Sequence, residues 1–201
     1  MSEARTRPER SEEDDKAFKK ELVALIPHLR AFARTLTGDA TAADDLAQDA
    51  MMKAWDARAS YQMGTNMKAW TFMILRNQFY SEKRRSWRQS QLDQEAVERT
   101  LVAVDDPESP VALDELRLAL ATLPEEQREA LILVGAGGFA YEEAAEICQC
   151  AVGTVKSRVS RARKALQATL ERGGYARDGR AAGDAMRSIL ADADRLSSVR
   201  G

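Results

Sequence analysis

The spacing of apolar residues constrains this chain more than any other feature of its sequence. From Phe18 to Leu36, and again from Val152 to Leu166, apolar side chains recur every three or four positions, which is the repeat of one face of an α-helix. Runs with the two-residue alternation of a half-buried strand are absent from the sequence. The spacing therefore predicts an all-α fold.

One acidic and polar stretch interrupts this pattern. It runs from about Gln89 to Pro110 and contains two prolines. A structureless stretch of that length would be unusual inside one compact domain. We therefore expect two small helical domains joined by an acidic flexible linker. The expected segments are a disordered tail 1–15, a first domain 16–88, the linker 89–110, a second domain 111–172, and a C-terminal tail 173–201 that could form a short helix.

Local signals place the helices of the first domain. One helix is expected from about Lys16 to Gly38, with a break or kink at Pro27. The spacing of Thr41 and Asp44 resembles a capping box and predicts the start of a second helix. A loop over 60–66 and a third helix from Met67 into a basic run follow.

The second domain is expected to contain a helix-turn-helix. A helix over 111–122 precedes Pro124, which suits the first position of the next helix. The glycines at 135–138 lack the lysine and hydroxyl of a phosphate-binding loop and are better explained as a helix end and turn. Two short helices over 141–148 and 152–170, separated by a three-residue turn, complete the motif.

Composition excludes several classes of function. The chain has one histidine and two cysteines, too few ligands for a His-rich metal site, a zinc finger or a disulfide framework. It has no nucleotide-binding or hydrolase motif and no catalytic nucleophile or acid–base constellation. We expect no enzyme activity, no metal, no cofactor and no small-molecule substrate. Without a long apolar run or a signal sequence, we expect a cytoplasmic protein that does not insert into a membrane.

Charge is strongly segregated, although 30 Lys and Arg nearly balance 32 Asp and Glu. Residues 76–88 carry five cations against Glu82, and residues 156–172 carry six against Glu171. Basic islands are the usual electrostatic footprint of nucleic-acid binding. A solvated helix face explains either island equally well when it is considered alone.

The second island lies on the second helix of the helix-turn-helix. Its apolar stripe is expected to face the core, and the opposite face is polar and cationic, comprising Thr154, Lys156, Ser157, Ser160, Arg161 and Lys164. Such side chains suit base edges in a major groove, while Arg158 and Arg163 on the flanks suit phosphates. A membrane-surface helix is the alternative, but large apolar anchors are missing.

The first island lies among aromatic residues. Seven aromatic side chains lie between Trp55 and Trp87, and aromatic rings beside cations are typical of sites that capture unstacked bases. Most of these rings must nevertheless pack in the core of so small a domain. The four that we expect to pack there are Trp55, Trp70, Phe72 and Phe79. The better candidates for nucleic-acid contact are Asn66, Arg76, Lys83 and Arg84.

Three separated motifs resemble those of bacterial extracytoplasmic-function (ECF) sigma factors. Residues 150–163, CAVGTVKSRVSRAR, resemble the recognition helix of their fourth domain, and residues 123–129, LPEEQRE, resemble the start of that domain. Residues 44–49, DDLAQD, with Trp55 resemble the helix by which their second domain binds core RNA polymerase. The resemblance covers nearly all of 16–172 and implies a sigma factor that directs promoter-specific transcription initiation.

The resemblance also implies roles for individual residues. The set implied to bind core polymerase is Asp45, Leu46, Gln48, Asp49 and Lys53. From the residues alone, Asp45, Gln48 and Asp49 form an acidic exposed face opposite Leu46 and Ala50, and Lys53 could pair with Asp49 at i,i+4. The set implied to contact the minus-ten element is Tyr61, Asn66, Arg76, Lys83 and Arg84. The set implied to contact the minus-thirty-five element is Thr154, Lys156, Ser157, Arg158, Ser160, Arg161 and Arg163.

Residues 138–148 look specifically like the general-stress-response branch of alphaproteobacterial sigma factors. That likeness implies three partners: core RNA polymerase, promoter DNA and a small helical anti-sigma factor. A sigma-like decoy that sequesters the anti-sigma factor without binding DNA is the alternative, but it predicts a neutralised recognition helix. An ordinary dimeric helix-turn-helix regulator would not need the acidic helix of the first domain.

Overall fold

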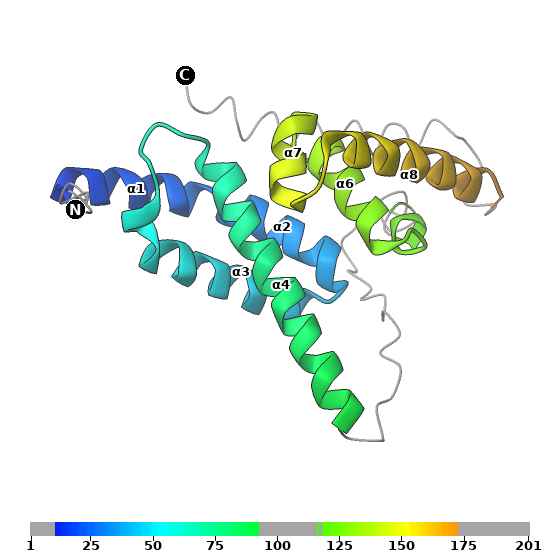
Figure 1. Ribbon diagram of the computed structural model, residues 1–201, viewed down its shortest axis with the longest axis horizontal. Helices are drawn as coiled ribbons and strands as arrows, with labels where there is room; N and C mark the ends of the chain where they lie inside the picture. The colour runs from blue at the N-terminus through cyan, green and yellow to red at the C-terminus, as the bar shows by residue number, and fades with distance from the viewer. Residues whose placement is uncertain (1–10, 93–115, 117, 173–201) are drawn as a thin grey trace, which may run out of the picture.

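The computed structural model describes residues 11–92, 116 and 118–172. Their helices are α1 (Glu12–Ala24), α2 (Ile26–Thr37), α3 (Ala40–Asp56), the 3-10 turn η1 (Arg58–Ser60), α4 (Met67–Leu92), α6 (Glu125–Gly135), α7 (Tyr141–Cys148) and α8 (Val152–Arg172). No strand occurs among these residues, so the all-α prediction is confirmed. Figure 1 shows α1 to α4 on one side of the molecule and α6 to α8 on the other.

The first helix starts earlier than the sequence pattern predicted. Ser11 caps α1, because its Oγ accepts a hydrogen bond from the Asp14 N–H at 3.1 Å. The Asp14 carboxylate in turn accepts from the Ser11 N–H at 3.1 Å, which completes a capping box. The helix therefore begins inside the segment that was expected to be a disordered tail.

Two breaks separate the next helices. The chain is interrupted at Leu25, and Pro27 lies in the first turn of α2, where a missing N–H costs no hydrogen bond. Gly38 ends α2 with φ of 73°, as predicted. The capping box expected from Thr41 and Asp44 is wrong: Asp39 caps α3 by accepting from the Ala42 N–H at 2.7 Å, and Asp44 instead pairs with Arg30 at 2.6 Å.

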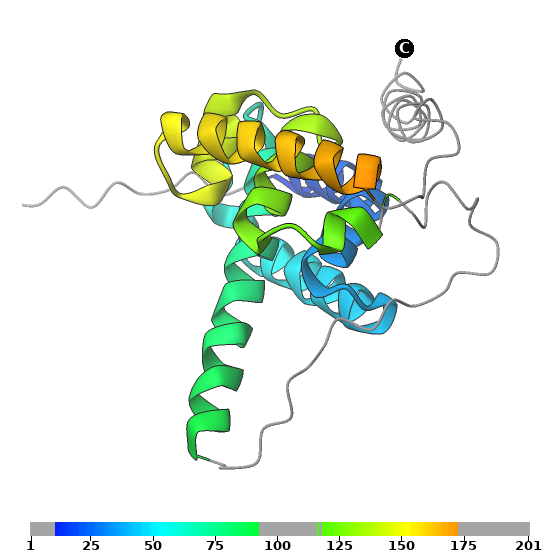
Figure 2. The ribbon, with the colours of Figure 1, turned by 90° about the vertical axis from the view of Figure 1, so that its right-hand side faces the viewer.

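The long helix α4 starts at Met67 as predicted, with the Asn66 Oδ1 accepting from the Ala69 N–H at 3.0 Å. It continues to Leu92, into the range expected to be the linker. Its last turns project away from the other described helices in both views (Figures 1 and 2). Residues 83–89, in these last turns, are exposed.

The helix-turn-helix of α7 and α8 has the predicted bounds at its turn. The recognition helix buries Val155, Val159, Ala162 and Leu166, which confirms its apolar stripe. Pro124 precedes α6 as its N-cap rather than its first residue. The glycines form the predicted helix end: Gly138 has φ of 67°, and a Cβ on Gly137 would lie 2.6 Å from the Leu133 carbonyl oxygen.

One apolar core joins the two groups of helices. The Phe72 ring stacks on Phe32 at 4.8 Å and meets the edge of Phe139 at 5.0 Å. Buried leucines from both groups, among them Leu75 and Leu133, belong to the same cluster. The two domains therefore pack against each other, α4 on α7 and α2 on α6.

A second apolar cluster lies around Phe18, which is fully buried. The other buried members of this cluster are Leu22, Ala54, Tyr61 and Met67. Trp55 and Trp70 pack against this cluster, and Phe79 packs against the larger core. The packing role predicted for these rings and for Phe72 is thus confirmed.

Replacing Leu75 with alanine should lower the free energy of unfolding by about 2–5 kcal/mol, because a fully buried side chain leaves a cavity. Leu118, which is 42% exposed, provides the matched control, and Leu118→Ala should change stability by no more than about 0.5 kcal/mol. Chemical denaturation followed by circular dichroism measures both. Equal losses would contradict the assignment of the core.

Candidate nucleic-acid and protein interfaces

The outer face of α3 carries the residues predicted to bind a partner. Asp45, Gln48 and Asp49 are exposed there. Leu46 is only 3% exposed and belongs to the main core, as its position opposite the acidic face predicted, so it does not lie on the surface with the other residues of the implied polymerase-binding set. Lys53 is exposed, but it donates to Gln78 of α4 rather than pairing with Asp49, because α3 packs against α4 and brings this amide within reach.

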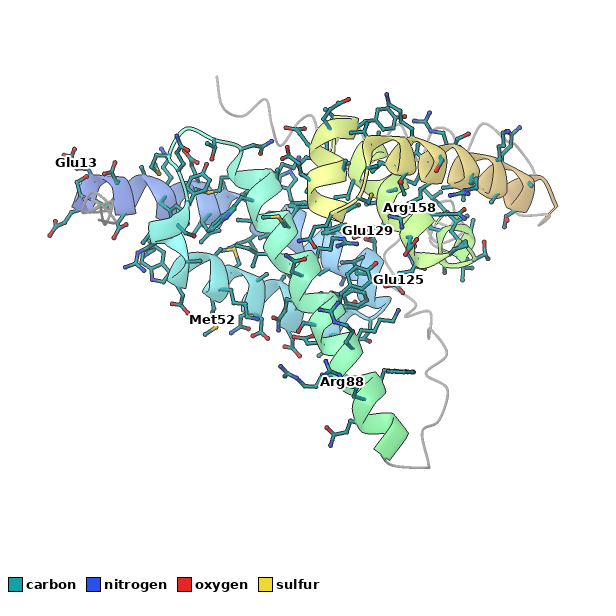
Figure 3. All side chains as sticks on the ribbon, in the orientation of Figure 1. Glu13, Met52, Arg88, Glu125, Glu129 and Arg158 are labelled. Atoms are coloured by element: carbon teal, nitrogen blue, oxygen red, sulfur yellow. The ribbon has the colours of Figure 1, made fainter. Side chains whose placement is uncertain are left out.

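Met52 belongs to the same surface and was missed. It is 58% exposed, and Figure 3 shows it on the outer side of α3. It follows Gln48 and Asp49 at spacings of four and three, so helical periodicity alone could have found it. The face therefore combines acidic groups with an accessible apolar side chain, a composition that suits a protein partner.

The loop between η1 and α4 does not present Tyr61 as predicted. Tyr61 is 6% exposed, its hydroxyl donates to the Thr65 carbonyl at 2.6 Å, and its ring lies 5.1 Å from Trp70. A side chain packed in this way serves as core, so it is not a platform for an unstacked base. The exposed part of the loop runs from Gln62 to Asn66.

The other residues predicted for the minus-ten element lie along α4, but three of them are held by carboxylates of the second domain. Asn66 donates to Glu143 of α7 at 2.6 Å. Arg76 donates to Glu129 of α6 at 2.6 Å, and Lys83 pairs with Glu125 of α6. Figure 3 shows Glu125 and Glu129 where α6 meets α4. The sequence predicted the place of these residues at the start of α4 and along it, but it gave no sign of the carboxylates that pair with them.

The Arg76–Glu129 pair is the most buried of these contacts. The Glu129 side chain is 0% exposed and that of Arg76 is 13% exposed. The Tyr80 hydroxyl also donates to Glu129, at 3.3 Å, and the guanidinium lies 4.5 Å from the centre of the Tyr80 ring. The carboxylate therefore has partners in place of water.

Burial and the charge of the partner oppose each other in this cluster. Burial raises the pKa of Glu129, although the Arg76 charge opposes the change. Burial alone would lower the pKa of Arg76, but the Glu129 charge and hydrogen bond outweigh it and raise that pKa. The pKa of Tyr80 is raised by burial and by Glu129.

Lys68 is a further link between the domains that sequence reasoning missed. Its Nζ donates to the Gly137 carbonyl at 2.7 Å and lies 5.1 Å from the centre of the Phe139 ring. Burial lowers the pKa of Lys68, and burial together with Lys68 lowers the pKa of His28. No sequence signal could have found this contact, because the acceptor is a backbone carbonyl in a distant turn.

The projecting end of α4 remains open to solvent. Arg84, a predicted site residue, is exposed together with Arg85 and Arg88. Trp87 is 63% exposed beside them, and Figure 3 shows Arg88 on this free part of the helix. An accessible indole among cations is the combination from which single-strand binding surfaces are built.

The recognition helix α8 presents the predicted polar face. Its exposed residues are Lys156, Ser157, Ser160, Arg161, Arg163 and Lys164. Thr154 is half-buried, and its carbonyl accepts from the Ser157 hydroxyl at 2.9 Å. Arg161 donates to the same hydroxyl at 3.4 Å. This face stays accessible while the two domains are packed together.

Arg158 does not lie free on the flank of α8 as predicted. It pairs with Glu126 of α6, and its Nη1 donates to the Cys150 sulfur at 3.6 Å. Its side chain is 14% exposed, so it positions α8 on α6. Figure 3 shows it between these two helices. The expectation of a phosphate contact came from spacing alone, which does not reveal a partner on another helix.

The cysteines behave as packing groups. Cys148 is buried and Cys150 is half-buried, and burial raises the pKa of the Cys148 thiol to about 12. In the part of the chain that the structure describes, no group of histidine, cysteine and acidic residues could hold a metal ion. No helix in that part is long and apolar enough to cross a membrane.

Comparison with known families decides the relationship. The model of Sigma-70 region 2 matches residues 22–89, and that of Sigma-70 region 4 matches residues 113–166. Over 154 residues the chain is 47% identical to the ECF RNA polymerase sigma factor EcfG of Rhodopseudomonas palustris. The aligned region covers 77% of this chain and 85% of the relative. The chain belongs to the ECF sigma factors of the sigma-70 family.

Solved structures agree with this membership. The sigma factor RpoE of Bartonella quintana, solved in complex with the anti-sigma factor NepR, is 48% identical, with a TM-score of 0.69, covering 78% of this chain and 98% of that one. CnrH, solved in complex with the cytosolic domain of CnrY, is 25% identical, with a TM-score of 0.56. The match covers 78% of this chain and 88% of CnrH. This sigma factor therefore shares its fold with a sigma factor that was co-crystallised with an anti-sigma factor.

Removing one member of the buried pair should destabilise this sigma factor strongly. Arg76→Ala leaves the Glu129 carboxylate buried without its cation, which should cost about 3–5 kcal/mol of unfolding free energy. The exposed Arg85 provides the control, and Arg85→Ala should cost no more than about 0.5 kcal/mol. Urea denaturation measures both.

The double variant Arg76→Met with Glu129→Leu separates the cost of an orphaned charge from the loss of packing. Because it removes both partners, it should regain most of the lost stability. A double variant as unstable as Arg76→Ala would show that the charge is not the cause.

Proposed function

We propose that this protein binds core RNA polymerase and directs promoter-specific transcription initiation in the cytoplasm, without catalysing a reaction itself. The observation that carries the proposal is the exposed cationic face of α8, in a chain whose two halves match the two sigma regions in order. In this proposal, residues 16–88 bind core polymerase and recognise and melt the minus-ten element. Residues 111–172 recognise the minus-thirty-five element, and residues 89–110 link these two domains.

Base readout at the minus-thirty-five element is assigned to Lys156, Ser157, Ser160 and Arg161, which share the exposed face of α8. Arginine and lysine donate to guanine acceptors, and hydroxyls serve several bases. Arg163 is exposed and suits a phosphate, and Thr154 lies at the start of the same face.

Polymerase binding is assigned to the exposed face of α3, formed by Asp45, Gln48 and Asp49 with Met52 and Lys53. The minus-ten element is assigned to the cationic side of α4, from Asn66 through Arg76 and Lys83 to Arg84. Carboxylates of α6 and α7 pair with three of these residues, and Arg76 is the one of the three that is largely buried, so contact between Arg76 and DNA requires α6 to move away.

An anti-sigma factor is the expected regulator. The related sigma factor of Bartonella quintana was solved with NepR, and the related protein from Rhodopseudomonas palustris bears the name EcfG. We therefore propose a small helical anti-sigma partner and a role in the general stress response. A decoy that binds no DNA is disfavoured, since the cations of α8 are retained and exposed.

Transcription by purified core RNA polymerase, with and without this protein, on a randomised promoter library tests the proposal. Initiation from a two-element consensus that depends on the protein supports it and supplies the recognition sequence. Failure to bind core polymerase, combined with tight binding to an anti-sigma factor, would instead favour the decoy.

Lys156→Ala or Arg161→Ala should lose about 1–3 kcal/mol of discrimination at particular base pairs, because each side chain lies on the exposed recognition face. Competition binding with single-base variants of the minus-thirty-five element measures the loss. Equal weakening on every sequence would indicate phosphate contacts and contradict base readout.

Asp49→Arg should weaken binding to core polymerase by at least tenfold, equivalent to about 1.4 kcal/mol, because it reverses a charge at the centre of the α3 face. The matched control is Glu21→Arg, an equal charge reversal at an exposed position of α1. Fluorescence anisotropy with labelled sigma factor measures both. Polymerase affinities that are the same for the two variants would remove Asp49 from the interface.

A further inference from the structure

The Lys156 ammonium lies against an aromatic ring of the other helix of the helix-turn-helix. Its Nζ is 5.7 Å from the centre of the Tyr141 ring, which is within the range of a cation–π attraction. Tyr141 is the first residue of α7, and Lys156 lies in the second turn of α8. The contact therefore joins the start of α7 to the exposed readout face of α8.

We propose that Tyr141 is a positioning residue for base readout, whose ring holds the Lys156 side chain in the direction from which its ammonium reaches a base edge. The inference rests on the proposed function, because it concerns the reading of the minus-thirty-five element by Lys156. Lysine carries a point charge on a flexible four-carbon stem, so an unsupported lysine loses side-chain entropy when it binds. A ring that restricts the stem before DNA arrives reduces this cost.

The Tyr141 ring is itself held in place. It is half-buried and packs against the main core, and α7 packs against α8. The start of α7 is fixed by Glu143, whose carboxylate accepts from the Ala140 N–H at 2.8 Å. Because a tyrosine side chain has only two rotatable bonds before its ring, the support is stiffer than the lysine stem that rests on it.

A ring supports the lysine without neutralising its charge. Among the residues that the structure describes, no carboxylate pairs with Lys156. Arg158, two residues further along α8, differs: it pairs with Glu126, and its side chain is only 14% exposed. Lys156 is exposed, and an aromatic face leaves its N–H groups available to donate to guanine acceptors. The contact with Tyr141 is therefore compatible with readout, whereas an ion pair would compete with it.

The other cation assigned to readout is supported within its own helix. Arg161 donates to the Ser157 hydroxyl at 3.4 Å, and that hydroxyl donates to the Thr154 carbonyl at 2.9 Å. The support of Lys156 comes instead from α7. Because the two cations depend on different groups, loss of the Tyr141 ring should affect the base pair read by Lys156 and spare the one read by Arg161.

The test uses two substitutions of Tyr141 in the full-length chain. Tyr141→Leu removes the ring and keeps apolar bulk against the core. Tyr141→Phe is the matched control, because it keeps the ring and removes only the hydroxyl. Each variant is made alone and together with Lys156→Ala. The DNA probe is a duplex that the wild-type protein selects from a random pool, and single-base variants of this duplex compete with it in a binding assay.

Tyr141→Leu should lose about two- to fivefold of the discrimination at the base pair read by Lys156, which is the fold-change that corresponds to an exposed cation–π contact. Discrimination at the other base pairs should stay unchanged, and Tyr141→Phe should behave like the wild type. In the Lys156→Ala background, Tyr141→Leu should cause no further loss, because the side chain that it positions is gone.

Nuclear magnetic resonance of the free protein gives a readout that does not depend on DNA. The ring should shift the Hε protons of Lys156 upfield in the wild type and in Tyr141→Phe, and this shift should vanish in Tyr141→Leu. Thermal melting confirms that the variants remain folded. Lys156 protons without a ring-current shift in the wild-type protein would overturn the inference, whatever the stability of the variants.

Three binding results would also overturn it. They are unchanged discrimination or tighter binding by Tyr141→Leu, an equal loss in Tyr141→Phe, which would assign the effect to the hydroxyl, and a loss that persists without Lys156. In each case Lys156→Ala alone judges the proposed function separately. If Lys156→Ala loses discrimination and Tyr141→Leu does not, readout by Lys156 stands and only the positioning role of Tyr141 is rejected.

Discussion

The buried pair of Arg76 and Glu129 is the contact on which the arrangement of the two domains depends. A carboxylate with no exposed surface must be paired and hydrogen-bonded, and here its partners, Arg76 and Tyr80, come from the other domain. Phe72 and Phe139 add apolar contact beside it. Separating the domains therefore rehydrates two charges and exposes aromatic surface, while keeping them together leaves Arg76 largely buried.

The helix α4 combines several roles because different parts of it have different neighbours. Its buried face supplies Phe72 and Leu75 to the core. Its cationic side meets the acids of α6 and α7, and its last turns leave the domain with Arg84, Trp87 and Arg88 accessible. In the packed molecule, the cations in the middle of α4 are thus paired with carboxylates of the second domain, while those of its last turns stay exposed.

Much of the fold could be predicted from the sequence because helical periodicity and turn residues are local signals. The apolar stripe of α8 and the end of α2 at Gly38 are examples, and the polar face of α8 was found by the same pattern. The domain interface was not predictable: Asn66, Arg76, Lys83 and Arg158 look like free polar groups in the sequence, and their acidic partners lie far along the chain. Motif resemblance put Leu46 and Tyr61 among the surface residues, because it identifies a segment without telling which side chains turn inward; helical spacing had already placed Leu46 opposite the acidic face.

The central claim is that the free protein is closed and that its domains separate when it acts at a promoter. Double electron–electron resonance between spin labels introduced by Glu21→Cys on α1 and Glu146→Cys on α7, in a Cys150→Ser background, measures this directly. Both label positions are exposed. The account predicts one narrow distance distribution for the free protein and a longer distance in the complex with core polymerase and promoter DNA. A broad distribution for the free protein, or a distance unchanged in the complex, would contradict it.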